Sequence, residues 1–141
     1  MKKYITLFSL LFITITLFSQ TEEQQITETL NRYIQGSSYS YPKLIESAFY
    51  EEASLFLSKK DQEIWLLSPK EYGALFEKRE RGVFNGRYGK ILTIDVSNNI
   101  AMAKAEISIP KSNMLFIDIF LLKKLEGKWK IISKAAAQIV D

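Results

Sequence analysis

The spacing of apolar residues predicts a helix directly after residue 20. Four apolar side chains fall at positions i, i+4, i+7 and i+8, which places them on one helical face: Ile26, Leu30, Tyr33 and Ile34. The segment 21–24 (TEEQ) has the pattern of a capping box, and Gly36 with the polar run 37–40 (SSYS) predicts the end of this helix. A second, short helix is predicted over 42–49, because proline suits the first helical position.

The apolar period changes to that of strands after residue 53. Segments 53–58 (ASLFLS) and 63–68 (EIWLLS) predict a β-hairpin, and a second capping box at 68–71 (SPKE) predicts a third helix. One face of that helix carries Tyr72, Leu75, Phe76 and Arg79. Four strands are predicted next, at 90–97, 100–110, 114–125 and, shorter, 128–134. Helices that precede a run of antiparallel strands predict an α+β fold, with the helices packed on one face of the sheet.

The predicted strand 114–125 (MLFIDIFLLKKL) is apolar on both faces. One face carries Leu115, Ile117, Ile119 and Leu121, and the other carries Met114, Phe116, Asp118, Phe120 and Leu122. A strand of this kind is covered on both sides. We therefore expect helices on one face and a second copy of the chain on the other, which makes a homodimer through the sheet.

The N-terminal segment changes the view of domain organisation and charge. Residues 1–19 begin with two lysines and continue with an apolar run that only Ser and Thr interrupt, which is typical of a secretory signal peptide. An uncleaved anchor or a buried N-terminal helix is the alternative. We expect cleavage near Ser19 and Gln20, a periplasmic or secreted protein without a stable membrane anchor, and a single domain over residues 20–141. Loss of Lys2 and Lys3 lowers the formal charge from +3 to +1, so charge does not indicate a nucleic-acid partner.

The composition limits the chemistry that the chain can perform. It has no Cys and no His, which excludes disulfides, thiolate metal sites and nucleophiles that a histidine activates. No group of three carboxylates has the spacing of a metal site, so we expect no metal, and we expect no cofactor. No catalytic residue is assigned from the sequence.

Asp118 is the main candidate for a ligand-binding residue. It is the one carboxylate in a segment where nine of twelve residues are apolar, and a buried charge is costly unless it is paired. Phe116 and Phe120 share its face, and apolar walls around one polar anchor are typical of small-molecule sites. The alternative is an ion pair with a lysine of a neighbouring strand, and three lysines qualify: Lys104, Lys130 and Lys134.

Further candidates are aromatic or lie in a loop. Tyr33 would act beside Asp118, and three more side chains are candidates for the cavity wall, although aromatic residues at such spacing commonly belong to the core: Trp65, Tyr72 and Trp129. The loop 81–90 (RGVFNGRYGK) offers Arg81, Arg87 and Lys90, with Phe84 and Tyr88, to an anionic ligand at a pocket mouth. Its glycines do not match a phosphate-binding loop, so we expect a flexible, solvated connector.

Four segments carry a family resemblance: 32–36 (RYIQG), 44–55 (LIESAFYEEASL), 91–107 (ILTIDVSNNIAMAKAEI) and 116–134 (FIDIFLLKKLEGKWKIISK). They resemble small NTF2-like domains, in particular the putative lumazine-binding (SnoaL-like) group. This resemblance implies a curved antiparallel sheet wrapped around helices, a cone with an internal pocket, and pairing through the sheet. Many relatives carry His where this chain has Tyr50, so a role for that His does not transfer.

The chain is also similar, more distantly, to ketosteroid isomerase. This resemblance places Tyr33 and Asp118 at the two oxyanion-hole positions, and it places Leu57 at the position of the general base. Proton transfer of the steroid type needs a base, so the sequence favours binding of a small apolar or aromatic ligand over catalysis. Two alternatives stay open: a cofactor-independent isomerase, cyclase or dehydratase, and a protein-interaction module that acts through its sheet face.

Overall fold

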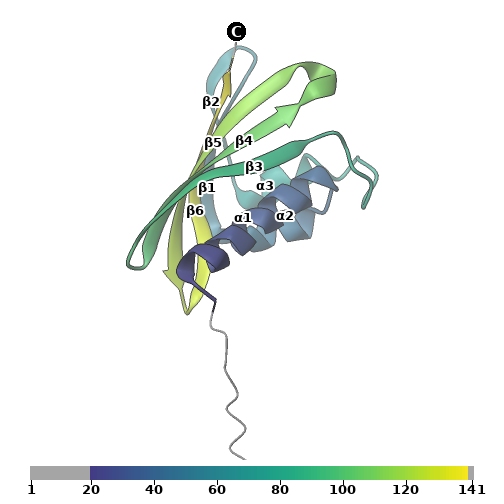
Figure 1. Cartoon of the computed structure of the whole chain (residues 1–141). Helices are drawn as coiled ribbons and strands as arrows, with labels where there is room; N and C mark the ends of the chain where they lie inside the picture. The colour runs from purple at the N-terminus through teal and green to yellow at the C-terminus, as the bar shows by residue number, and fades with distance from the viewer. Residues whose placement is uncertain (1–19, 140–141) are drawn as a thin grey trace, which may run out of the picture.

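The computed structural model describes residues 20–139 and shows three helices and six strands (Figure 1). The helices are α1 (Glu22–Ser38), α2 (Pro42–Ala48) and α3 (Pro69–Ala74). The strands are β1 (Phe49–Lys59), β2 (Gln62–Leu67), β3 (Tyr88–Ser97), β4 (Ile100–Ile109), β5 (Met114–Leu125) and β6 (Lys128–Ile139), with a 3-10 turn, η1 (Pro110–Ser112), before β5. The predicted signal peptide, residues 1–19, lies outside the described residues. Within the described range, no helix is long and apolar enough to cross a membrane.

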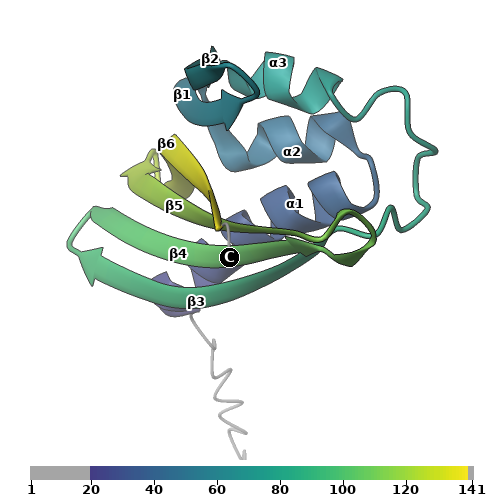
Figure 2. The same cartoon turned by 90° about the horizontal axis from the view of Figure 1, so that it is seen from above.

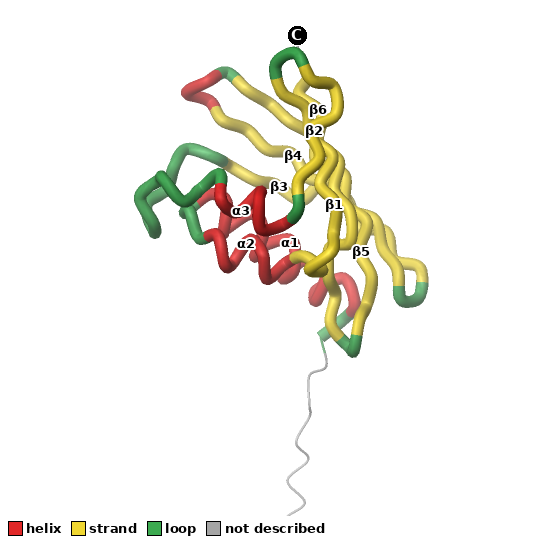
Figure 3. The backbone as a smooth tube through the Cα atoms, turned by 180° about the vertical axis from the view of Figure 1, so that it is seen from behind, coloured by secondary structure: helices red, strands yellow, loops and turns green. Residues whose placement is uncertain are grey.

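The six strands form one curved sheet in the order β2-β1-β6-β5-β4-β3. The three helices lie on its concave side (Figure 2), and the tube in Figure 3 shows the same arrangement from behind. The α+β prediction is therefore confirmed. The predicted strands are antiparallel to their neighbours along the chain, but the hairpin β1–β2 joins the remaining strands through a parallel pair, β1 with β6. The last strand is also longer than predicted, since β6 continues to Ile139, which lies opposite Leu115.

Both predicted capping boxes are present at the helix N-termini. The Thr21 side chain accepts a hydrogen bond from the backbone N–H of Gln24 at 3.1 Å, and the Ser68 side chain accepts one from Glu71 at 3.2 Å. Each box satisfies N–H groups that have no partner inside the helix. The third helix is shorter than its pattern suggested, and Leu75 is exposed after its end.

Helix α1 ends at Ser38, within the segment 36–40 that predicts its end, but Gly36 itself lies inside the last helical turn. A Cβ atom at Gly36 would lie 2.8 Å from both Cγ1 and the backbone nitrogen of Ile45 in α2. The glycine therefore allows α1 and α2 to pack closely together. Its role is one of contact rather than of helix termination.

The loop before β3 is anchored to the end of α1, which corrects the expectation of a solvated connector. The Asn85 side chain donates to the carbonyl of Ser37 at 2.7 Å, and its backbone N–H donates to the carbonyl of Ser38 at 2.9 Å. The Ser38 hydroxyl in turn donates to the carbonyl of Arg87 at 2.6 Å. The last carbonyls of a helix lack partners within it, so this loop supplies donors to the end of α1.

The two faces of the sheet differ in their surroundings. On the concave face, Phe120 and Leu122 of β5 are buried with small and aliphatic side chains of β4, so the predicted helical cover is present. On the convex face, Ile119 and Leu121 are each 50% exposed. The helices thus cover one face, and the described residues leave the other face open.

Candidate functional site

Asp118 forms a buried ion pair with Lys134. Its Oδ2 lies 3.1 Å from the Nζ of Lys134, and both side chains are 2% exposed. This is one of the three lysine pairings that the sequence left open. The partner is set by an irregularity in register between β5 and β6, where Leu121 lies opposite Ser133 but Leu122 lies opposite Ile131. The extra residue in β6 turns Lys134 toward the concave face, to which Trp129 and Ile131 also point.

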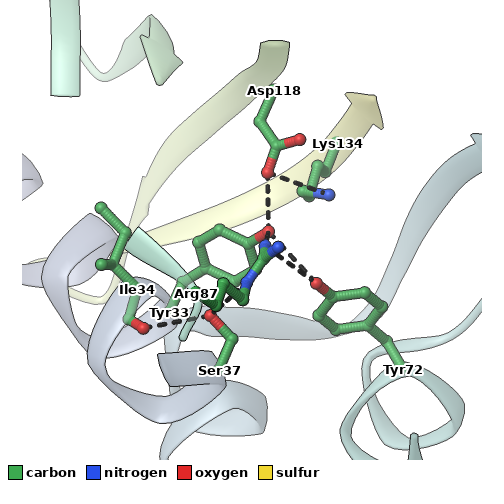
Figure 4. Close-up of polar contacts among 7 residues, drawn as sticks. All are labelled: Tyr33, Ile34, Ser37, Tyr72, Arg87, Asp118 and Lys134. Atoms are coloured by element: carbon green, nitrogen blue, oxygen red, sulfur yellow. Dashed lines mark hydrogen bonds and ion pairs between the residues drawn. The ribbon is translucent and has the colours of Figure 1, made fainter. Parts of the chain in front are cut away.

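Tyr33 joins the ion pair to a second cation. Its hydroxyl donates to Oδ2 of Asp118 at 2.6 Å and lies 3.2 Å from the hydroxyl of Tyr72 (Figure 4). The Nη2 of Arg87 donates to the Tyr33 hydroxyl at 2.7 Å and to the Tyr72 hydroxyl at 3.3 Å. The Nε of Arg87 donates to the Ser37 hydroxyl at 3.0 Å, so the guanidinium has a defined orientation.

Burial and neighbouring charged or polar groups together set the ionisation of this network. Burial, together with the charge on Asp118, raises the pKa of Tyr33 well above its ordinary value, although the nearby Arg87 acts in the opposite direction. Burial acts to lower the pKa of Arg87, but attraction to the oxygens of Tyr33, Tyr72 and Asp118 outweighs it and the net pKa is raised. The phenol is therefore neutral and the guanidinium is charged near neutral pH.

A cavity of about 490 Å³ opens above this network. Four of the seven candidate residues line it: Asp118, Phe116, Trp65 and Tyr72. Further apolar wall is supplied by Leu57, Leu75, Phe76, Ile109 and Ala136. Its volume falls within the range of small-molecule sites, which is roughly 300–1,000 Å³.

Three of the candidate residues lie away from the cavity wall. Tyr33 is fully buried and contributes only its hydroxyl to the network beneath the cavity. Phe120 is a core residue that packs edge-on against Tyr33, with ring centroids 5.4 Å apart. Trp129 is buried elsewhere in the core, and its indole N–H donates to Glu22 at 2.5 Å. Sequence periodicity correctly placed these aromatic residues on inward faces. It did not distinguish residues that line the cavity from residues that are buried in the hydrophobic core.

Cations dominate the charged lining, and the sequence did not predict this. Five of the six charged side chains that line the cavity are basic: Lys59, Lys60, Arg79, Arg87 and Lys134. The sequence predicts Arg87 only as a contact at the pocket mouth, and Lys134 only as an alternative partner of Asp118. No local pattern in the sequence around Arg87 or Lys134 marks either residue as a buried cation.

The lining carries little that would drive proton transfer or bind a metal. Leu57, which falls at the base position of the isomerase, lies on the cavity wall, and Asp118 is the one acidic side chain in the lining that the structure describes. Tyr50 is exposed on β1, where its hydroxyl donates to Glu52 at 3.2 Å. Within residues 20–139, no three acidic side chains are close enough together to hold a metal ion.

Several solved structures share the fold. An NTF2-like protein of unknown function from Methylobacillus flagellatus KT is 27% identical over 86% of this chain and 95% of its own, with a TM-score of 0.74. One from Shewanella baltica OS155 is 24% identical over 87% of this chain and 100% of its own, with a TM-score of 0.73. A ketosteroid isomerase-like protein from Erwinia carotovora atroseptica SCRI1043 is 13% identical over 86% of this chain and 100% of its own, with a TM-score of 0.61.

A comparison with curated proteins gives no match. The family comparison agrees with the structural one and with the resemblance seen in the sequence. Residues 21–135 match the model of the family described as Putative lumazine-binding, and the chain therefore belongs to this NTF2-like family.

Proposed function

We propose that the protein binds a small organic molecule in the cavity above Asp118, Tyr33 and Arg87. The observation that carries this proposal is the combination of aromatic walls with an ordered polar floor. Trp65 and Phe116 line the cavity together with Asp118. Apolar walls give affinity, while a few well-placed polar groups fix the orientation of a ligand. The family description points in the same direction, because it names a small heterocyclic ligand.

The floor has unused hydrogen-bonding capacity that a ligand would occupy. Oδ2 of Asp118 receives Tyr33 and faces Lys134, whereas Oδ1 has no hydrogen-bond partner within residues 20–139. Nη1 of Arg87 likewise has none among the described side chains and carbonyls. Polar groups in such a position are commonly bonded to ligand or water. Asp118 and Arg87 would thus orient the bound molecule.

Binding is favoured over catalysis because the cavity offers no evident base. Leu57 supplies apolar surface at the position where the isomerase has its base, and Asp118 is engaged with Lys134 and Tyr33. Both contacts are made by Oδ2 of this carboxylate. The isomerase, cyclase or dehydratase alternative would require a proton acceptor that the ligand itself provides.

We also propose that two copies associate through the convex sheet face. The strand register aligns apolar side chains in one row across β2, β1, β6 and β5: Leu66, Phe56, Ala135 and Ile119. Leu121 and Met102 lie opposite each other and form a second apolar pair beside this row. On β4, Lys104 lies opposite Ile119 and Glu106 lies opposite Ile117, so opposite charges adjoin the apolar side chains. A two-fold dimer needs such a self-complementary surface. The competing possibility, a protein-interaction module, would use the same face.

The proposed site of action is outside the cytoplasm. Residues 1–19 have the pattern of a signal peptide, with two lysines before an apolar run. N-terminal sequencing of the protein recovered from its native cells checks this proposal. A mature chain that begins near Gln20 supports export, whereas a chain that still begins at Met1 contradicts it.

A thermal-shift screen tests the binding proposal. Pterins, flavins, steroids, fatty acids and aromatic acids would be added to the purified protein. A ligand at one hundred times its Kd adds about 2.7 kcal/mol to the free energy of unfolding, so a clear and saturable rise in Tm is expected for at least one class.

Two variants locate the bound molecule. Leu57→Trp fills the cavity and should abolish the shift, whereas Ile64→Trp lies on the exposed side of β2 and should preserve it. No shift from any class, or a shift that persists in Leu57→Trp, would contradict binding in this cavity.

A further inference from the structure

We propose that the cavity selects organic acids: molecules with an aromatic or apolar body and one carboxylate that Arg87 and Lys134 hold. This inference rests on the proposed function, since it takes the same cavity as the ligand site. It differs from the sequence prediction, in which a single carboxylate, Asp118, anchored a largely apolar ligand. In the structure, the carboxylate of Asp118 is already paired with Lys134. The protein would therefore supply the cations, and the ligand would supply the carboxylate.

The first step is the charge balance of the floor. Arg87 is 9% exposed and Lys134 is 2% exposed, so two cations are buried there. Asp118 is the one acidic side chain in the described lining, and it lies against Lys134. The groups that Arg87 contacts are neutral hydroxyls of Tyr33, Tyr72 and Ser37. One buried positive charge is therefore left without a compensating anion, which is costly.

The second step is the geometry of the free donors. Nε and Nη2 of Arg87 bind hydroxyl groups, and Nη1, which has no partner among the described residues, belongs to a residue of the cavity lining. Lys134 has three donors and one carboxylate neighbour, and its Nζ lies 5.3 Å and 5.2 Å from the ring centres of Tyr33 and Tyr72. An incoming carboxylate would meet both cations and form charge-assisted hydrogen bonds.

The third step concerns the mouth of the cavity, where cations lie on aromatic rings. The Nζ of Lys59 is 4.7 Å from the ring centre of Trp65, and the guanidinium of Arg79 is 5.4 Å from that of Phe76. Lys60 adds a further cation to the lining. A cleft lined by charges of one sign attracts ions of the opposite sign. The mouth therefore favours the approach of an anion.

The aromatic walls indicate an organic anion rather than an inorganic one. Four aromatic side chains line the cavity: Trp65, Tyr72, Phe76 and Phe116. A small inorganic anion would leave these rings in contact with water, whereas an aromatic or aliphatic body would cover them. The cations and the rings together define a carboxylic acid with a substantial apolar part.

Two matched fluorescent probes test this inference. 1-Anilinonaphthalene-8-sulfonate carries an anionic group, and N-phenyl-1-naphthylamine has the same rings without it. We expect the anionic probe to bind the purified protein at least about tenfold more tightly, since a hydrogen bond to a charged group contributes more than 1.4 kcal/mol. We also expect 2-naphthoate to displace it at lower concentration than 2-naphthamide does.

Variants assign the selectivity to the cavity. Arg87→Gln should weaken binding of the anionic probe about tenfold and leave binding of the neutral probe unchanged, provided that circular dichroism shows an intact fold. Because Arg87 also contacts Ser37 and Tyr33, a second variant avoids the buried network: Lys60→Gln with Arg79→Gln, at two exposed positions. This double variant should weaken binding of the anionic probe and make that binding less dependent on salt. Lys43→Gln, at an exposed position of α2, should change neither.

The possible outcomes separate the two proposals. Equal binding of both probes, or an unchanged preference in folded Arg87→Gln, overturns the acid selectivity and leaves the proposed function standing. Displacement of the anionic probe by inorganic phosphate as readily as by 2-naphthoate overturns the organic-acid class. Loss of the anionic probe signal in Ile119→Lys, on the convex face, would place the probe outside the cavity and overturn the inference. Failure of all four compounds to bind counts against the proposed function as well.

Discussion

The Nζ of Lys134 lies 3.1 Å from Oδ2 of Asp118, and each side chain is 2% exposed. Two charges are thus removed from water at the centre of the concave face. A buried pair of this kind contributes little net stability, but the loss of one member leaves an uncompensated charge. The pair therefore explains how an aspartate is kept within an apolar strand, and it makes both residues sensitive to substitution.

Asp118→Leu is expected to lower the free energy of unfolding by about 3–5 kcal/mol, because Lys134 then stays buried without its partner. The double variant Asp118→Leu with Lys134→Met should recover most of this loss, since neither charge remains. Urea unfolding of the four proteins in the cycle measures both effects. A single variant as stable as the wild type would show that water or another group compensates the lysine.

Tyr33 should make stability fall at alkaline pH. Burial and the charge of Asp118 raise its pKa in the folded state, against the opposing effect of Arg87, so the folded protein holds the phenol proton more tightly than the unfolded chain does. The contribution to stability is full below about pH 10, the ordinary pKa of tyrosine, and is lost as the pH rises from there through the folded pKa.

In Tyr33→Phe, the decline in unfolding free energy above about pH 10 should be less steep by up to about 1.4 kcal/mol per pH unit. Urea unfolding at a series of alkaline pH values measures the slope. Tyr88→Phe, at an exposed position of β3, is the control and should retain the wild-type slope. Equal slopes for Tyr33→Phe and the wild type would argue against a raised pKa.

Gly36→Ala should destabilise the protein although alanine is the better helix former by about 1 kcal/mol. Its Cβ would lie 2.8 Å from the backbone nitrogen of Ile45, so relief requires a shift of α2 and not only of a side chain. Gln35→Ala, at the neighbouring exposed position of α1, should be neutral or slightly stabilising. Thermal unfolding compares the two, and an increase in Tm for Gly36→Ala would refute the close contact.

Ile119→Lys should convert a dimer into a monomer. This side chain lies in the apolar row of the convex face, and two lysines brought together across a two-fold axis would repel each other. Sedimentation velocity over a range of concentrations measures the change. The control is Val83→Lys, which introduces the same charge at an exposed apolar position away from the sheet, in the loop between α3 and β3. A wild-type protein that is monomeric at every concentration would rule out the proposed association.

The sequence alone determined the local structure and the family. Capping boxes specify the N-termini of α1 and α3 because they satisfy backbone groups close in sequence. The turns at Asn98 and Gly127 adopt positive φ, which asparagine and glycine tolerate. Alternation along β5 correctly assigned Asp118 and Phe120 to one face, since no irregularity interrupts β5 between them. These features depend on short-range geometry, and the sequence contains all of it.

Only the tertiary structure decided the charge of the site. Lys134 faces the cavity because β6 contains an extra residue opposite β5, and simple alternation cannot reveal such a shift. Arg87 lies in a loop that the sequence predicts to be solvated, but hydrogen bonds from Asn85 and Ser38 hold this loop on the end of α1. The same packing brings Tyr33 within 2.7 Å of Arg87, 54 positions along the chain. Contacts between distant segments therefore made a cationic floor out of residues that no local pattern places together.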